Sequence, residues 1–146
     1  YEMTSSLVGS EMCIRDRDMI LEKDTYVKKA ENVIKELAKN TDKRGNTKWI
    51  TTSQIRNLLA MSADIYNEVI MSDEKLSPEL SSRIDYLRVR CVYEAGRTPV
   101  VKEFIEKAQI LQALEEVKGS RERFILFNHY MEALVAYHRY NRGKDN

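Results

Sequence analysis

The chain has 146 residues, enough to bury one hydrophobic core and too few for two ordinary domains. Hydrophobic residues make up 42% and charged residues 32%, with only 5 Gly and 2 Pro, so the composition excludes disorder and favours helix. The 24 Lys and Arg nearly balance the 23 Asp and Glu, leaving a net charge of +1. Any basic surface for a nucleic acid must therefore be local.

The cysteines and the hydropathy pattern indicate the cellular compartment in which the protein works. Cys13 and Cys91 form no C-x-x-C pair and are too few for a disulfide framework, which fits a reducing cytoplasm. No apolar run approaches the length of a membrane span. We therefore expect a soluble, cytoplasmic protein.

The first residues differ in character from the rest of the chain. Residues 5–17 (SSLVGSEMCIRDR) have neither a helical period nor the pattern of a signal peptide. The string resembles translated read-through of a sequencing adapter. We expect residues 1–17 to be a non-native or disordered leader and residues 18–146 to form a single helical domain.

Two helices are predicted in the first half of that domain. Residues 18–40 carry apolar side chains at i, i+3, i+4 and i+7 spacing, which is typical of an amphipathic helix. Residues 41–49 (TDKRGNTKW) are polar and contain a glycine, so they are expected to form a loop. A second helix is predicted from Thr51, because Thr51 and Gln54 fit a capping box, and should end near Ser72.

Three further helices are predicted from their caps, over residues 77–96, 98–119 and 120–140. Each begins with a Ser or Thr suited to an N-cap, and the first two have proline at the next position. Gly96 and Gly119 stand where a left-handed residue would end a helix. The fold class expected is an all-α bundle of about five helices.

The last predicted helix has two apolar faces, which requires it to be central or shared with a partner. Both possibilities stay open from the residues alone. If the helix is shared, the second face would be a subunit interface, and its residues are Leu126, Tyr130 and Tyr137.

No arrangement of residues predicts catalysis, a metal or a cofactor. His129 and His138 are nine positions apart, so they do not share a helix face as metal ligands would. The sequence has no phosphate-binding glycine motif and no nucleophile elbow. An enzyme is therefore the weakest hypothesis.

A basic stretch without acids is the one polar feature that indicates a binding surface, namely one for an anion. Residues 43–63 contain no Asp or Glu and include the start of the second helix, where the helix dipole favours an anion. Trp49 could stack on a base or fill the core, and the core is the preferred interpretation. The cations of this stretch are Lys43, Arg44, Lys48 and Arg56, and its neutral donors are Thr51, Thr52, Ser53 and Gln54.

The third helix carries a second basic group. Arg83, Arg90 and Arg97 recur every seven residues and so lie nearly on one line of the helix surface. They could contact RNA, or they could pair with Asp85 and Glu94 on a solvated face. Both interpretations stay open, with Arg90 as the candidate RNA contact.

Two separated segments resemble a known family. KWITTSQIRNLL (residues 48–59) and FNHYMEALVAYHRYNRGKD (residues 127–145) together resemble the small subunit of the type III-A CRISPR effector, the Csm complex. The likeness covers roughly residues 26–145. It departs at residues 141–143, where the family often has consecutive glycines and this chain has Asn-Arg-Gly.

The resemblance implies a non-catalytic subunit that binds the backbone of guide and target RNA without reading sequence. Several copies would pack against one another and against other Csm subunits. Carried over to this chain, the family's T-S-Q-x-R motif falls on Thr52, Ser53, Gln54 and Arg56. Lys48, Gln54 and Arg56 are the preferred backbone contacts, with Lys43 and Arg44 next.

Two alternatives remain from the residues alone. A short basic helix beginning Thr-Thr-Ser-Gln could be the recognition helix of a helix-turn-helix DNA binder, although the tight turn and helix expected before it are missing. The chain could also be a purely structural helical adaptor whose basic loop is simply solvated.

Overall fold

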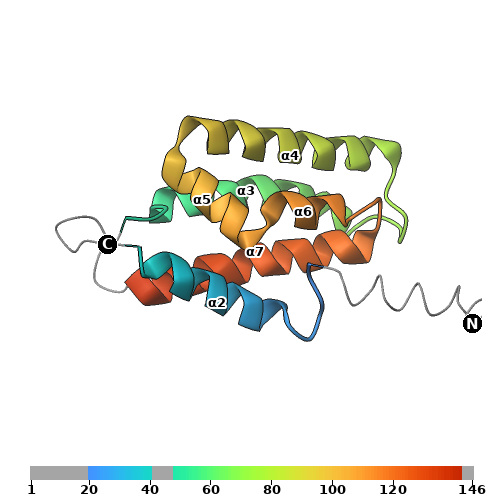
Figure 1. Cartoon of the computed structure of the whole chain (residues 1–146). Coiled ribbons are helices and arrows are strands. Elements are labelled where there is room, and N and C mark those ends of the chain that lie inside the picture. The colour runs from blue at the N-terminus through green and yellow to red at the C-terminus, as the bar shows by residue number, and fades with distance from the viewer. Residues whose placement is uncertain (1–19, 41–47, 143–146) are drawn as a thin grey trace, which may run out of the picture.

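The computed structural model describes residues 20–40 and 48–142, except for the side chain of residue 142 (Figure 1). The predicted all-α bundle is confirmed, and the described part has no β-strand, only one isolated antiparallel bridge between Lys75 and Ser120. The leader predicted at residues 1–17 lies outside the described residues. The helices are α2 (Tyr26–Ala38), α3 (Thr52–Val69), α4 (Pro78–Arg97), α5 (Pro99–Ala108), α6 (Ile110–Glu115) and α7 (Arg121–Arg142).

The helices lie in three tiers around one core. In Figure 1, α4 forms the top tier, α3, α5 and α6 the middle, and α2 and α7 the lower tier. α7 packs along both α2 and α3, whereas α4 packs only against α3, α5 and α6. The largest fully buried side chains, contributed mainly by α5 and α7, are Tyr130, Phe104, Phe124 and Phe127.

Local capping signals place several helix ends as predicted. The Ser77 hydroxyl accepts a hydrogen bond from the Leu80 backbone N–H at 3.2 Å, and proline follows it at the first helical position. Gly119 is left-handed as predicted, with φ +76°, but α6 already ends at Glu115, so this glycine lies in the turn before α7. The Ser120 hydroxyl, at the start of α7, accepts from the Arg123 N–H at 3.3 Å. These ends depend on residues three positions apart, which is why the sequence predicts them.

The prediction for Gly96 was wrong. Gly96 lies inside α4, which continues to Arg97, and the following Thr98 is extended with φ −134° and ψ 114°. Pro99 explains this geometry, because a residue before proline is driven out of the helical region into the extended one. Proline thus ends α4 without a left-handed glycine.

α2 begins later than predicted because tertiary contacts hold the residues before it. The Ile20 N–H donates to Glu116 Oε2 at 2.7 Å, and the Arg123 guanidinium donates to the Leu21 carbonyl oxygen at 2.8 Å. Leu21 itself is buried. These contacts compete with helix formation, so the regular helix starts only at Tyr26.

The predicted fourth helix is broken into α5 and α6 at Gln109, which has a left-handed φ of 57°. The Lys29 ammonium donates to Gln109 Oε1 at 2.6 Å, and the Tyr130 hydroxyl donates to the Ala108 carbonyl oxygen at 2.9 Å. An unbroken helix would turn polar Gln112 toward the core. The break rotates the following residues about the helix axis, so that the buried face after Gln109 is formed by Ile110, Ala113, Leu114 and Val117.

Candidate nucleic-acid interface

The start of α3 is fixed by the predicted capping box. The Thr51 hydroxyl accepts from the Gln54 N–H at 3.1 Å, and Gln54 Oε1 accepts from the Thr51 N–H at 2.9 Å. The box therefore occupies two backbone donors that the helix end would otherwise offer to an anion. Gln54 can still donate through its amide Nε2, but cationic side chains have to supply most of any attraction for phosphate.

The residues just before α3 are anchored to the end of α7. Trp49 is 6% exposed, which confirms it as a core residue, and its ring centroid lies 4.4 Å from that of His138. His138 is fully buried, with Nε2 2.7 Å from the Ile50 carbonyl oxygen. These contacts hold the start of α3 rigidly against α7.

Lys48 and Arg56 lie exposed on either side of this anchored segment. Within residues 20–40 and 48–142, neither side chain forms an ion pair. The Lys48 backbone is held by Asn40, whose carbonyl oxygen accepts from the Lys48 N–H at 2.7 Å. Asn40 Nδ2 also donates to Glu103 Oε1 at 2.8 Å, which leaves one acid beside the basic surface.

The other residues predicted to contact RNA differ in their exposure, and two of them lie outside the described residues. Ser53 is exposed beside Arg56, whereas Thr52 and Gln54 are half-buried. Lys43 and Arg44 fall outside the described residues. We define the α3 surface as Lys48, Ser53, Gln54 and Arg56.

The arginines of α4 lie near carboxylates. Arg90 lies 3.7 Å from Glu94 Oε2 and Arg97 lies 3.8 Å from Glu94 Oε1, as one of the two interpretations predicted. The other expected partner, Asp85, forms no ion pair among the described residues. Arg83 reaches across to Glu68 of α3 instead. Arg90 is therefore separate from the α3 surface, and it shares the one negative charge of Glu94 with Arg97.

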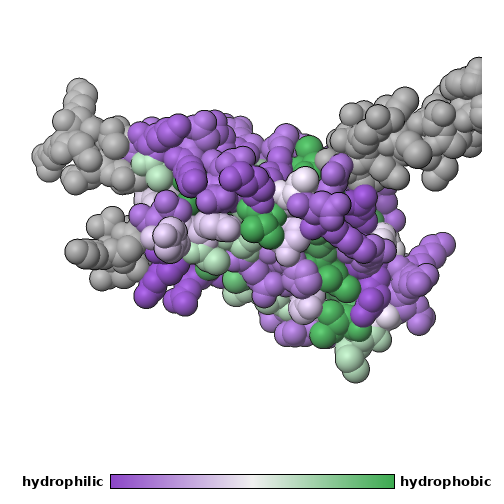
Figure 2. All heavy atoms as spheres, turned by 90° about the horizontal axis from the view of Figure 1, so that it is seen from below, coloured by the Kyte–Doolittle hydropathy of each residue, from purple (hydrophilic) through white to green (hydrophobic). Residues whose placement is uncertain are grey.

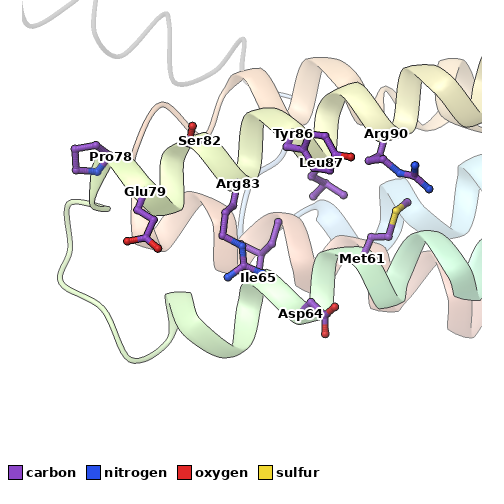
Figure 3. Close-up of a pocket in the computed structure, with 10 residues that line it drawn as sticks. All are labelled: Met61, Asp64, Ile65, Pro78, Glu79, Ser82, Arg83, Tyr86, Leu87 and Arg90. Carbon is purple, nitrogen blue, oxygen red and sulfur yellow. The ribbon is translucent and has the colours of Figure 1, made fainter.

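An open groove of about 850 Å³ lies between α3 and α4 (Figure 3). Met61 and Ile65 of α3 and Tyr86 and Leu87 of α4 line it, with Arg90 at one end. Apolar side chains share its lining with acids such as Asp64 and Glu79. Such a groove suits a protein side chain better than a phosphate.

The structure corrects the predicted subunit interface on α7. Leu126 is 6% exposed and Tyr130 is fully buried, because α7 is the central helix and packs between α2 and α3. Tyr137 is partly buried against the same core. Leu126 and Tyr130 are therefore core residues and are not available to a partner.

α4 carries an exposed apolar surface that was not predicted from the sequence. Its members are 52–63% exposed and occupy the helix face opposite the buried stripe that includes Leu87 and Cys91. A signal was present, since this helix has apolar residues on two opposite sides. We define the α4 surface as Tyr86, Val89, Val92 and Tyr93.

The described residues contain neither a cluster of metal-binding side chains nor a membrane-spanning helix. Among the described residues, no group of three or more His, Cys, Asp and Glu side chains is arranged to hold a metal ion. No described helix is both long enough and apolar enough to cross a bilayer. His129 lies with its ring centroid 6.5 Å from that of Tyr26 and 6.1 Å from that of Tyr66, away from His138.

Comparison with known proteins assigns the family. Residues 27–144 match the model of the family described as Csm2 Type III-A. A protein from Streptococcus thermophilus named "CRISPR system Cms protein Csm2" is 49% identical over 126 residues, covering 86% of this chain and 98% of the relative. A protein of the same name from Mycobacterium tuberculosis (strain ATCC 25618 / H37Rv) is 41% identical, covering 84% and 95%. Another from Enterococcus italicus is 36% identical, covering 80% and 89%. The chain therefore belongs to the Csm2 type III-A family.

Proposed function

We propose that this chain is the non-catalytic small subunit of a cytoplasmic type III-A CRISPR effector, where its α3 surface holds guide and target RNA by their backbone. The observation that carries the proposal is the pair of exposed cations, Lys48 and Arg56, without carboxylate partners in the described part of the chain. Family membership supports an RNA-guided assembly as the setting. In such an assembly base pairing reads sequence, so the protein needs only charges and donors spaced along phosphates.

A helix-turn-helix is disfavoured by the arrangement of α2 and α3. α2 ends at Ala38 and α3 begins at Thr52, so the connection is far longer than the tight turn of that motif. Both helices also pack lengthwise along α7. α3 is thus part of the bundle wall and does not protrude as a recognition helix.

A second part of the proposal assigns the α4 surface to contact with another copy of the chain. The surface contains two exposed tyrosines and lies beside Arg90 and Arg97, and tyrosine and arginine are enriched at protein interfaces. Because Glu94 lies between Arg90 and Arg97, its single negative charge offsets part of their positive charge and lowers the repulsion between two copies. The exposed tyrosine and valine side chains make this surface better suited to a protein than to RNA.

The test compares affinities of the full chain for single-stranded RNA, RNA duplex and DNA duplex over a salt series. Arg56→Gln should weaken RNA binding irrespective of sequence and reduce the slope of log affinity against log salt by about 0.7–0.9, one phosphate contact. Lys118→Gln is the matched control, since Lys118 is an exposed cation that follows α6, far along the bundle from Arg56. It should leave the slope unchanged.

Two outcomes would overturn the proposal. Sequence-selective binding of DNA duplex would favour a DNA-binding protein. Absence of salt-dependent RNA binding by the wild-type chain, measured at low salt with an RNA long enough for several copies, would favour the structural adaptor.

A further inference from the structure

The last described turn of α7 presents an exposed tyrosine beside an arginine. His138 points into the core, whereas Arg139 and Tyr140 are exposed, and Tyr140 exposes 82% of its surface. Within the described residues, the Tyr140 ring contacts no other ring and no guanidinium. Tyr93 of the α4 surface is different, because its ring centroid lies 5.7 Å from the Arg90 Cζ.

The pairing of α3 with α7 brings this turn to the same end of the bundle as the α3 surface. Ser62 donates to Asn128 Oδ1 at 2.7 Å midway along the two helices, and His138 meets Ile50 at their end. The two helices are therefore antiparallel, and the segment leading into α3 lies level with the last turn of α7 (Figure 1). Lys48 and Arg139 thus belong to one end of the molecule despite the sequence distance between them.

This end of the lower tier is hydrophilic. Figure 2 views the bundle from below, where α2 and α7 lie, and apolar side chains gather toward the end where α7 begins. Toward the end where α7 finishes, the described surface is mostly polar. Tyr140 is therefore an exposed aromatic beside Arg139 on a mostly polar end of the molecule, and it is not part of an apolar protein-binding patch.

The electrostatics of a helix C-terminus constrain how RNA could approach. The carbonyl groups there carry about half a negative charge, which repels phosphate along the helix axis. Asn141 Nδ2 donates to the Tyr137 carbonyl oxygen at 2.8 Å and so occupies one of these groups. The full positive charge of Arg139 on the side of the helix outweighs the remainder, and phosphate would approach from that side.

We infer that Arg139 and Tyr140 form the second half of the RNA surface, with Tyr140 stacking on an unpaired base and Arg139 contacting an adjacent phosphate. The inference rests on the proposed function and extends it from backbone contacts on α3 to a base-stacking contact on α7. Stacking on an aromatic ring tolerates any base, so it adds affinity without sequence selectivity.

The test measures binding of the full chain to single-stranded RNA and to blunt RNA duplex. Tyr140→Ala should weaken single-stranded binding roughly five-fold or more, with an unchanged salt slope, because stacking involves no net charge. Tyr140→Phe should bind like wild type, since the ring is kept. Arg139→Gln should lower the slope by about 0.7. Binding of blunt duplex should not respond to Tyr140→Ala.

Met71→Ala is the control, because Met71 is 84% exposed and belongs to neither the α3 surface nor the α4 surface. Equal effects of Tyr140→Ala and Met71→Ala on RNA affinity would overturn the inference. So would a Tyr140→Ala variant that binds RNA normally but no longer self-associates, which would make Tyr140 a protein contact.

If Arg56→Gln lowers the salt slope while Tyr140→Ala has no effect, only this inference fails. If wild type binds no RNA, the proposed function fails with it.

Discussion

Replacement of Trp49 tests whether the start of α3 is held by core packing. The side chain is 6% exposed and its ring lies against His138 at the end of α7. Burial of about 150–250 Å² at about 25 cal/mol per Å² corresponds to about 4–6 kcal/mol as an upper estimate. Trp49→Ala should therefore lower the free energy of unfolding by about 3–5 kcal/mol. Trp49→Phe keeps an aromatic ring over His138 and should cost only about 1–2 kcal/mol.

The assay is urea unfolding followed by circular dichroism of the helices, because Trp49 is the chain's only tryptophan and its fluorescence disappears in the variants. Met71→Ala is the control, since Met71 is 84% exposed and its loss should change stability by less than about 0.5 kcal/mol. The reasoning is refuted if Trp49→Ala loses less than about 1 kcal/mol and yet binds RNA more weakly. That result would mean that Trp49 contacts RNA and does not anchor α3.

Three other predictions concern the α3 cap, Cys91 and the α4 surface. Thr51→Ala removes one half of the capping box and should cost about 1 kcal/mol in urea unfolding, whereas Ser53→Ala, at an exposed position outside the box, should cost little. Burial raises the pKa of the Cys91 thiol to about 11, so the folded state favours the neutral thiol. Its contribution is complete below pH 9 and is lost as pH rises toward 11; we expect stability to fall by up to about 2–3 kcal/mol more in wild type than in Cys91→Ala, and parallel pH profiles would exclude the effect. Val89→Asp should abolish concentration-dependent self-association in sedimentation without lowering stability, because Val89 is 58% exposed; persistence of the association would exclude the α4 surface.

Much of the helical framework depends on residues close together in sequence. The capping box of Thr51 and Gln54, the Ser77 cap and the Ser120 cap were predictable because each uses backbone and side chains within three positions. The acid-free stretch that supplies Lys48 and Arg56 could also be identified, since charge is a property of composition. Its role in binding RNA remains a proposal.

The failures occur where distant residues decide the outcome. The break at Gln109 depends on Lys29, which is 80 positions away, and on Tyr130 of α7. The compensation of Arg83 requires Glu68 on a different helix. Neither contact produces a periodic pattern along the chain, so the sequence predicts one continuous helix and leaves the partner of Arg83 open.

The position of α7 shows most clearly which features local sequence determines and which depend on tertiary structure. By itself the sequence determined that this helix has two apolar faces and must be central or shared, because apolar area on both sides has to leave water. Only the tertiary structure decided that it is central: α7 packs along α2 and α3, Leu126 and Tyr130 are buried, and the surface of four exposed tyrosine and valine side chains is on α4. The antiparallel pairing of α3 and α7 also brings Arg139 and Tyr140 to the end where Lys48 lies. Such proximity depends on how helices pack, which the order of residues along one helix does not specify.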